Sequence, residues 1–278
     1  MRVNANISAL NAARNLSVSQ AGLQKSLEKL SSGFRINRAA DDAAGLAISE
    51  GLRSEIRGNT QAQRNAQDGI SFIQTAEGAL TEVHSMLQRM RELAVQASNT
   101  ATSTGVSENA EYQALATEIG NIGARTKFAG KAVFSASALV FQVGANSGET
   151  ASVTTGTMLG AVSITGFDDT SPATLLATTG ILTGAGNADA AITLITTAIG
   201  KVSTARGAMG ATQNTLEHTV ANLGVAVENL TASESRVRDV DMAAEMVTFT
   251  KNQILSQAGT AMLAQANQVP QGILQLLR

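Results

Sequence analysis

Apolar residues recur at alternating steps of three and four along both ends of this 278-residue chain. Such spacing places one narrow apolar stripe on a helix, which is the pattern of a coiled coil. The run Ser31-Ser32-Gly33 then predicts where the first helix ends. The N-terminal stripe consists of Ala13, Leu16, Gln20, Leu23, Leu27, Leu30 and Phe34, with one polar lapse at Gln20.

Further stripes predict more long helices. A second helix is expected to end at the Ser/Thr/Gly-rich run 98–105, and a shorter one is expected over 108–125. In the C-terminal third, one stripe follows the same steps and another recurs every seven residues. The three stripes are Leu80, Val83, Leu87, Met90, Ala94 and Ala97; Leu216, Val220, Leu223, Val227 and Leu230; and Val240, Val247, Ile254 and Ala261.

The middle of the chain has a different composition. Residues 132–200 contain no Lys or Arg, and two short β-prone runs, 140–143 and 150–153, flank a Gly/Asn-rich turn. The stretch 154–189 lacks long periodicity. Aromatic residues make up 3% of the chain, too few for an ordinary round core. The sequence therefore predicts a mainly α fold, a long-helix antiparallel coiled-coil bundle with a small β-hairpin and a short irregular or β insertion.

Both ends of the chain are nearly uncharged. Residues 1–24 carry only Arg2 and Arg14, and residues 246–278 carry only Lys251 and Arg278. A helix of this kind can be enclosed by protein on several sides without burying unpaired charge. One copy cannot enclose both of its own ends, so we expect repeated contacts between copies. The expected polymerisation residues are Leu16, Leu23, Leu27, Leu30, Val247, Ile254, Ala261 and Leu263.

Charge and motifs argue against other function classes. A net charge of −2 offers no basic field for nucleic acid or an anionic membrane, and no apolar run is long enough for a membrane span. We expect no cleaved secretory leader. The two histidines, His84 and His218, lie in no metal-binding motif. Asp41-Asp42 is interpreted as a helix N-cap rather than a metal site, and Asp239 and Asp241 as polar groups at a junction between helices. We expect no enzyme activity and no cofactor.

Five segments at the two ends carry a resemblance to a known family. They are SSGFRIN at 31–37, DDAAGLAI at 41–48, RNAQDGIS at 64–71, EGAL at 77–80 and QAGTAMLAQANQVPQ at 257–271. In this order and position they resemble the conserved end blocks of bacterial flagellin. The resemblance covers roughly residues 1–131 and 200–278.

The resemblance implies a division of the chain into layers. Residues 1–42 and 240–278 would form an inner coiled coil, and 43–154 with 198–239 a helical bundle that carries the hairpin. Residues 155–197 would form a small variable insertion on the surface.

The resemblance also implies a role and partners. The chain would be secreted unfolded through the flagellar type III apparatus and would polymerise with its own copies into the extracellular filament. An export chaperone, a filament cap and hook-associated junction proteins would be its partners.

Arg89, Leu93 and Glu118 match the positions that the animal Toll-like receptor recognises in this family. Arg89 and Leu93 lie four residues apart and so share a helical face. The alternative, which we weigh more heavily, is that these residues make contacts along the filament, where Arg is a common anchor.

Three other functions compete with a filament subunit. A hook–filament junction protein would share the end helices but would not grow long filaments. A secreted coiled-coil adhesin would have ordered ends as a monomer. An enzyme would require a polar constellation that the sequence does not contain.

Overall fold

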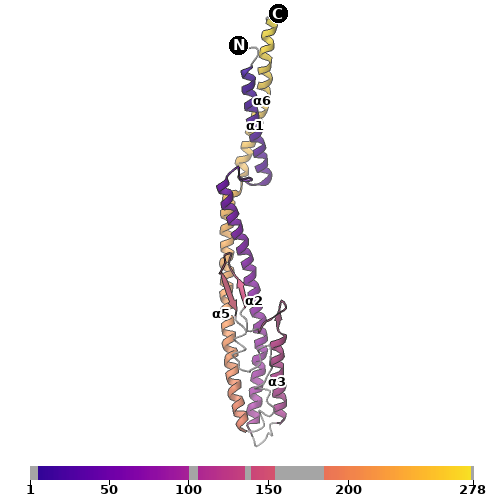
Figure 1. Cartoon of the computed structure of the whole chain (residues 1–278), viewed down its shortest axis with the longest axis vertical. Coiled ribbons are helices and arrows are strands. Elements are labelled where there is room, and N and C mark those ends of the chain that lie inside the picture. The colour runs from indigo at the N-terminus through magenta and orange to yellow at the C-terminus, as the bar shows by residue number, and fades with distance from the viewer. Residues whose placement is uncertain (1–5, 100–105, 135–138, 154–184, 277–278) are drawn as a thin grey trace. The chain divides into compact units, whose positions relative to one another are not determined.

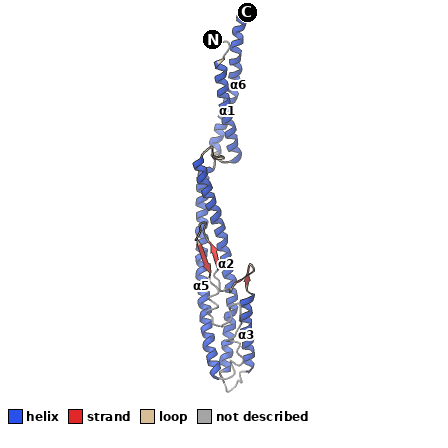
Figure 2. Ribbon diagram, in the orientation of Figure 1, coloured by secondary structure: helices blue, strands red, loops and turns tan. Residues whose placement is uncertain are grey.

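The chain is described here from a computed structural model that covers residues 6–99, 106–134, 139–153 and 185–276. The chain forms two compact units. The first unit contains residues 1–56 and 228–278, and the second contains residues 57–227. Figures 1 and 2 show that long helices account for most of both units.

The helices confirm the mainly α prediction. Their bounds are α1 Ile7–Ser32, α2 Ala43–Ala97, α3 Val106–Arg125, α5 Ala185–Arg238 and α6 Met242–Leu276. The ends predicted for α1, α2 and α3 agree with these bounds to within two residues. Helices α2 and α5 each contribute residues to both units.

In the first unit, α1 and α6 pair as antiparallel helices (Figure 1). Asn6 Nδ2 donates to the Ala266 carbonyl at 2.7 Å, and at the other end Lys29 Nζ lies 3.9 Å from a Glu245 oxygen. Asn6 also caps α1, because its side-chain oxygen accepts from the Ala9 N–H at 3.1 Å. The helix ends at Gly33, whose φ of 76° suits a left-handed cap.

In the second unit, α2 and α5 run antiparallel around the hydrophobic core. Arg206 Nη2 lies 3.5 Å from Glu77 Oε1, and Ser98 Oγ bonds Asp189 Oδ1 at 3.1 Å. Buried positions on α2 alternate at steps of three and four, and those on α5 do so from Ala188 to Met209. On α2 they are Asn59, Ala62, Ala66, Gly69, Ile73, Ala76, Leu80, Val83, Leu87, Met90, Ala94 and Ala97. The predicted α2 stripe is therefore confirmed.

Helix α3 packs on a second stripe of α2. Phe72 and Leu93 are buried beside the main stripe, and Tyr112 and Ile119 of α3 join the same core. A helix with two buried stripes has two neighbours, which explains why α2 holds α5 and α3 together.

The predicted hairpin is present. Strands β3, Leu139–Gln142, and β4, Thr150–Val153, pair antiparallel, with Leu139 opposite Val153. Phe141 of β3 lies 6.0 Å from Phe72 of α2 between ring centroids, so the hairpin packs on the helical core.

A second, smaller hairpin was not predicted. Strands β1, Lys127–Phe128, and β2, Lys131–Ala132, pair through a turn at Ala129 and Gly130, both of which have positive φ. Two-residue strands have no recognisable alternation, and Gly130 was the only local signal.

Helix α5 begins inside the segment 155–197 that the sequence predicts to be an insertion. Residues 185–197 are helical because Ala188, Ala191 and Ile195 bury one stripe in the core of the second unit. Residues 155–184 lie outside the described residues. The boundaries of the two compact units also differ from those expected for the filament layers, and that layer division stays a prediction.

Candidate polymerisation surface

The α1–α6 pair is held by facing seams made largely of small and polar residues. Both seams alternate at steps of three and four. On α1 the seam residues are Ala9, Ala12, Leu16, Ser19, Leu23, Ser26 and Leu30, and Gly22, Glu28 and Lys29 are partly covered beside them. On α6 the seam residues are Glu245, Phe249, Asn252, Ser256, Gly259, Leu263 and Ala266.

Small residues bring the two backbones close together. A Cβ placed on Gly22 would lie 3.0 Å from Asn252 Nδ2, and one on Gly259 would lie 3.2 Å from Leu16 Cδ1. The larger residues of the seam, such as Leu16, Leu23 and Leu263, supply its apolar contact.

The N-terminal stripe read from the sequence coincides only partly with the seam that faces α6. Leu16, Leu23 and Leu30 do face α6, but Leu27 is 52% exposed. Between these leucines the seam is formed by Ala12, Ser19 and Ser26. The sequence had placed Ala13, Gln20 and Leu27 at those positions of the stripe. Small side chains are needed at these positions because α1 and α6 approach each other closely. A search of the sequence for large apolar residues does not find them.

The stripe read on α6 faces away from α1. Val247 is 71% exposed and Ile254 is 60% exposed, and Ala261 is exposed as well. These residues are spaced by seven and lie on the side of α6 opposite its seam with α1. Of the expected α6 residues only Leu263 belongs to that seam. The more apolar face of α6 is therefore uncovered in a single copy.

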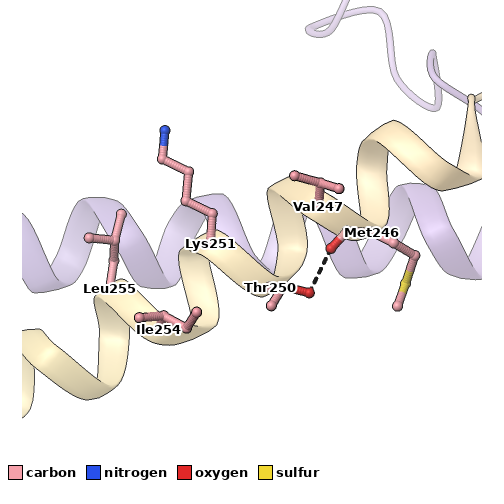
Figure 3. Close-up of a pocket in the computed structure, with 6 residues that line it drawn as sticks. All are labelled: Met246, Val247, Thr250, Lys251, Ile254 and Leu255. Atoms are coloured by element: carbon pink, nitrogen blue, oxygen red, sulfur yellow. Dashed lines mark hydrogen bonds between the residues drawn. The ribbon is translucent and has the colours of Figure 1, made fainter.

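Figure 3 shows the hollow on this uncovered face, formed along successive turns of α6. Thr250 satisfies its hydroxyl within the helix, since Oγ1 donates to the Met246 carbonyl at 2.8 Å. Lys251 is the one charged residue among those that line the hollow. The lining residues are Met246, Val247, Thr250, Lys251, Ile254 and Leu255.

The α1–α2 connection and the α5–α6 connection are tied together. The Arg35 N–H donates to the Arg238 carbonyl at 2.7 Å, and the Val240 N–H donates to the Gly33 carbonyl at 3.0 Å. The Arg238 guanidinium lies 2.8 Å from Glu50 Oε1 and 4.8 Å from the centroid of the Phe34 ring. The pKa of Glu50 is lowered, and the hydrogen bond from Arg238 is the main cause.

Asp42 caps a helix as interpreted from the sequence, and Asp241, expected only as a polar group at the junction, caps one too. Asp42 Oδ1 accepts from the Gly45 N–H at 2.9 Å at the start of α2, and Asp241 Oδ1 accepts from the Ala243 N–H at 2.9 Å at the start of α6. Asp41 holds the preceding loop, and the hydrogen bond from the Arg38 backbone is the largest cause that lowers its pKa. Asp239 accepts from Ser235 Oγ at 2.6 Å.

The three candidates for receptor or axial contact differ in their exposure to solvent. Arg89 is exposed on α2 and bonds Glu111 Oε1 of α3 at 2.8 Å, which raises the pKa of Arg89. Glu118 is exposed on α3 and accepts from Asn121 Nδ2 at 3.0 Å. Leu93, by contrast, is only 2% exposed and belongs to the core between α2 and α3. Spacing alone placed Leu93 beside the α2 seam and could not show that α3 covers it.

Neither metal-binding nor membrane-spanning features occur in the parts of the chain that the structure describes. Those parts contain no group of three His, Cys, Asp or Glu residues that could hold a metal ion. None of their helices combines the length and apolarity that a membrane crossing requires.

Comparisons with known proteins match both ends of the chain to one protein family. The family model for the bacterial flagellin N-terminal helical region matches residues 3–138, and that for the C-terminal helical region matches residues 192–277. The flagellins of Bacillus subtilis and Halalkalibacterium halodurans are 49% and 53% identical, and each alignment covers all of both chains.

A filament protein and a solved structure also match. The flagellar filament 33 kDa core protein of Treponema phagedenis is 45% identical, again over the whole of both chains. The crystal structure of Bacillus cereus flagellin has 29% sequence identity and a TM-score of 0.47, covering 58% of this chain and 88% of that one. Nothing in these comparisons favours the hook–filament junction alternative. The chain belongs to the bacterial flagellin family, and it is a self-assembling structural subunit of the flagellar filament rather than an enzyme.

Proposed function

We propose that the uncovered face of α6, centred on Val247, Ile254 and Ala261, is the surface through which copies of this chain polymerise. The observation that carries the proposal is the position of this apolar repeat. It lies opposite the seam with α1, so the helix pair leaves it in water. Water contact with apolar side chains is unfavourable, and a neighbouring copy would remove it.

Helix α1 also has exposed apolar residues. Ile7, Leu10, Val18 and Leu27 are all more than half exposed. These residues and the α6 repeat are different surfaces of one copy, so a contact that joins one to the other between copies would be heterologous. Repeated heterologous contacts that do not close into a ring build a helical filament.

The low charge of these helices supports the same role. Lys251 is the only charged residue from 246 to 277. Enclosure of this stretch by several neighbours would therefore bury almost no charged side chain. Leu16, Leu23, Leu30 and Leu263 would then act indirectly, because they hold α1 and α6 together and so form the surface that neighbours meet.

Family membership supports finer expectations about export and partners. We infer that the chain leaves the cell through the flagellar type III apparatus and adds at the filament tip beneath the cap. An export chaperone and hook-associated junction proteins would be its partners on that route. The flagellin family forms an extracellular filament, and we infer the same location for this chain.

Arg89 and Glu118 are the candidates for contacts along the filament, since both are exposed on the second unit. The same residues could meet the animal Toll-like receptor only in a free subunit. Leu93 would contribute by supporting α2 and α3 from within, because it is buried between them.

Two deletions test the polymerisation surface. Removal of all residues after Ala244 should abolish seeded filament growth, seen by negative-stain microscopy, while the second unit stays folded by circular dichroism. Removal of part of 155–184 should leave growth largely intact. Equal loss of growth in both variants would contradict the proposal. Failure of the intact chain to form long filaments from seeds would instead favour the junction-protein alternative.

A further inference from the structure

Five of the described methionines are either well exposed or fully buried, and a sixth, Met86, is partly buried. On α6, Met242, Met246 and Met262 are 48%, 49% and 65% exposed. In the core of the second unit, Met90 and Met209 are sealed from solvent. An oxidant dissolved in water therefore reaches the α6 sulfurs and is kept from those in the core.

Two of the exposed methionines, Met246 and Met262, lie on the nearly uncharged stretch of α6 whose enclosure by neighbouring copies we propose. Met246 lines the same hollow as Val247 and Ile254, and Figure 3 shows the three residues along successive turns of α6. Met262 follows Ala261 directly, so it lies on α6 beside the Val247–Ile254–Ala261 face rather than on it. Met242 is the first residue of α6 and lies outside the residues that line the hollow.

We propose that Met246 and Met262 are oxidation sites through which peroxides prevent a free subunit from joining the filament. The inference rests on the proposed polymerisation surface. In the reaction the thioether sulfur attacks one oxygen of hydrogen peroxide, the O–O bond breaks and an S–O bond forms. Proton transfer releases water, so the sulfur is oxidised by two electrons and the peroxide is reduced.

Oxidation changes the chemistry of the surface without touching the core. A sulfoxide is polar and carries a strong acceptor oxygen, and burial of that oxygen without a donor is unfavourable. The hollow offers few donors, because the Thr250 hydroxyl is already used within α6 and the other lining side chains are apolar apart from Lys251. Subunits already in a filament would be protected, since neighbours cover the same sulfurs.

The test compares oxidation and growth in the full-length chain. Monomer is treated with graded hydrogen peroxide, sulfoxide at each methionine is quantified by peptide mass spectrometry, and the critical concentration for seeded growth is measured. We expect sulfoxide at Met246 and Met262 with none at Met90 and Met209. The critical concentration should rise by about tenfold or more, and methionine sulfoxide reductase should reverse the rise.

Matched variants assign the effect to the two sites. Met246→Leu with Met262→Leu keeps the surface apolar, so this double variant should assemble normally after peroxide treatment. Met242→Leu removes an equally exposed sulfur outside the hollow and should stay as sensitive as the wild type. Rescue by Met242→Leu, or none by the double variant, would overturn the assignment.

Treated filaments separate the two proposals. If Met246 oxidises as fast in preformed filaments as in monomer, the polymerisation surface itself is wrong. If Met246 is protected in filaments but oxidised monomer still assembles at the normal concentration, only the redox inference fails.

Discussion

The substitution Ile254→Asn tests the polymerisation surface at its centre. Ile254 is 60% exposed in a single copy, so the change removes little from the folded subunit. In a filament the same side chain would be enclosed by a neighbour. The substitution should therefore weaken growth while it leaves the subunit intact.

The expected magnitude follows from the exposed fraction. Full burial of an isoleucine side chain is worth about 1.5–3 kcal/mol, and about 60% of that, roughly 1–2 kcal/mol, remains to be gained when a neighbour covers Ile254. Each ~1.4 kcal/mol changes an equilibrium constant about tenfold, so the critical concentration should rise roughly 5- to 30-fold. An unpaired asparagine amide in the contact would add to this rise.

Sedimentation of seeded reactions over a range of concentrations measures the critical concentration. Ile254→Leu serves as the matched control, because it keeps the apolar volume and should change growth little. Circular dichroism should show the same helical content for both variants as monomers. Growth of Ile254→Asn at the wild-type critical concentration would refute the surface.

Three further predictions concern the folded subunit. Phe72→Ala should destabilise the second unit by about 3–5 kcal/mol, because Phe72 is buried and packs on Phe128 at 5.8 Å and on Phe141; a loss below ~1 kcal/mol in denaturant unfolding would be inconsistent with that core. Arg238→Ala should speed hydrogen exchange at the Arg35 and Val240 amides, and unchanged exchange would show that the Arg238 contacts do not hold the junction. Because the pKa of Glu50 in the folded chain lies below its ordinary value of 4.5, its contribution to stability is present above about pH 4.5 and is lost as pH falls through the folded pKa. The difference in Val240 exchange between wild type and Glu50→Gln should therefore shrink on acidification, and a difference that persists at the lowest pH would count against the Arg238–Glu50 contact.

Local signals in the sequence determined most of the helical architecture. The α2 stripe through Leu80 and Leu87 is buried as predicted, and Gly33 ends α1 where the Ser-Ser-Gly run placed the stop. The β3–β4 hairpin also agrees, since its turn residues and β-prone runs are adjacent in the chain. Such features depend on neighbours within one or two helical turns, so periodicity and capping residues are sufficient to find them.

Only the tertiary structure decided which face each helix buries. Val247 and Ile254 form a regular apolar repeat, yet α1 packs on the opposite face of α6, where Gly259 and Ser256 permit close approach. Leu93 is covered by α3, although its spacing gave no sign of a second neighbour. A repeat shows that a stripe exists but does not say which partner covers it, because that depends on residues far away in the chain or in another copy.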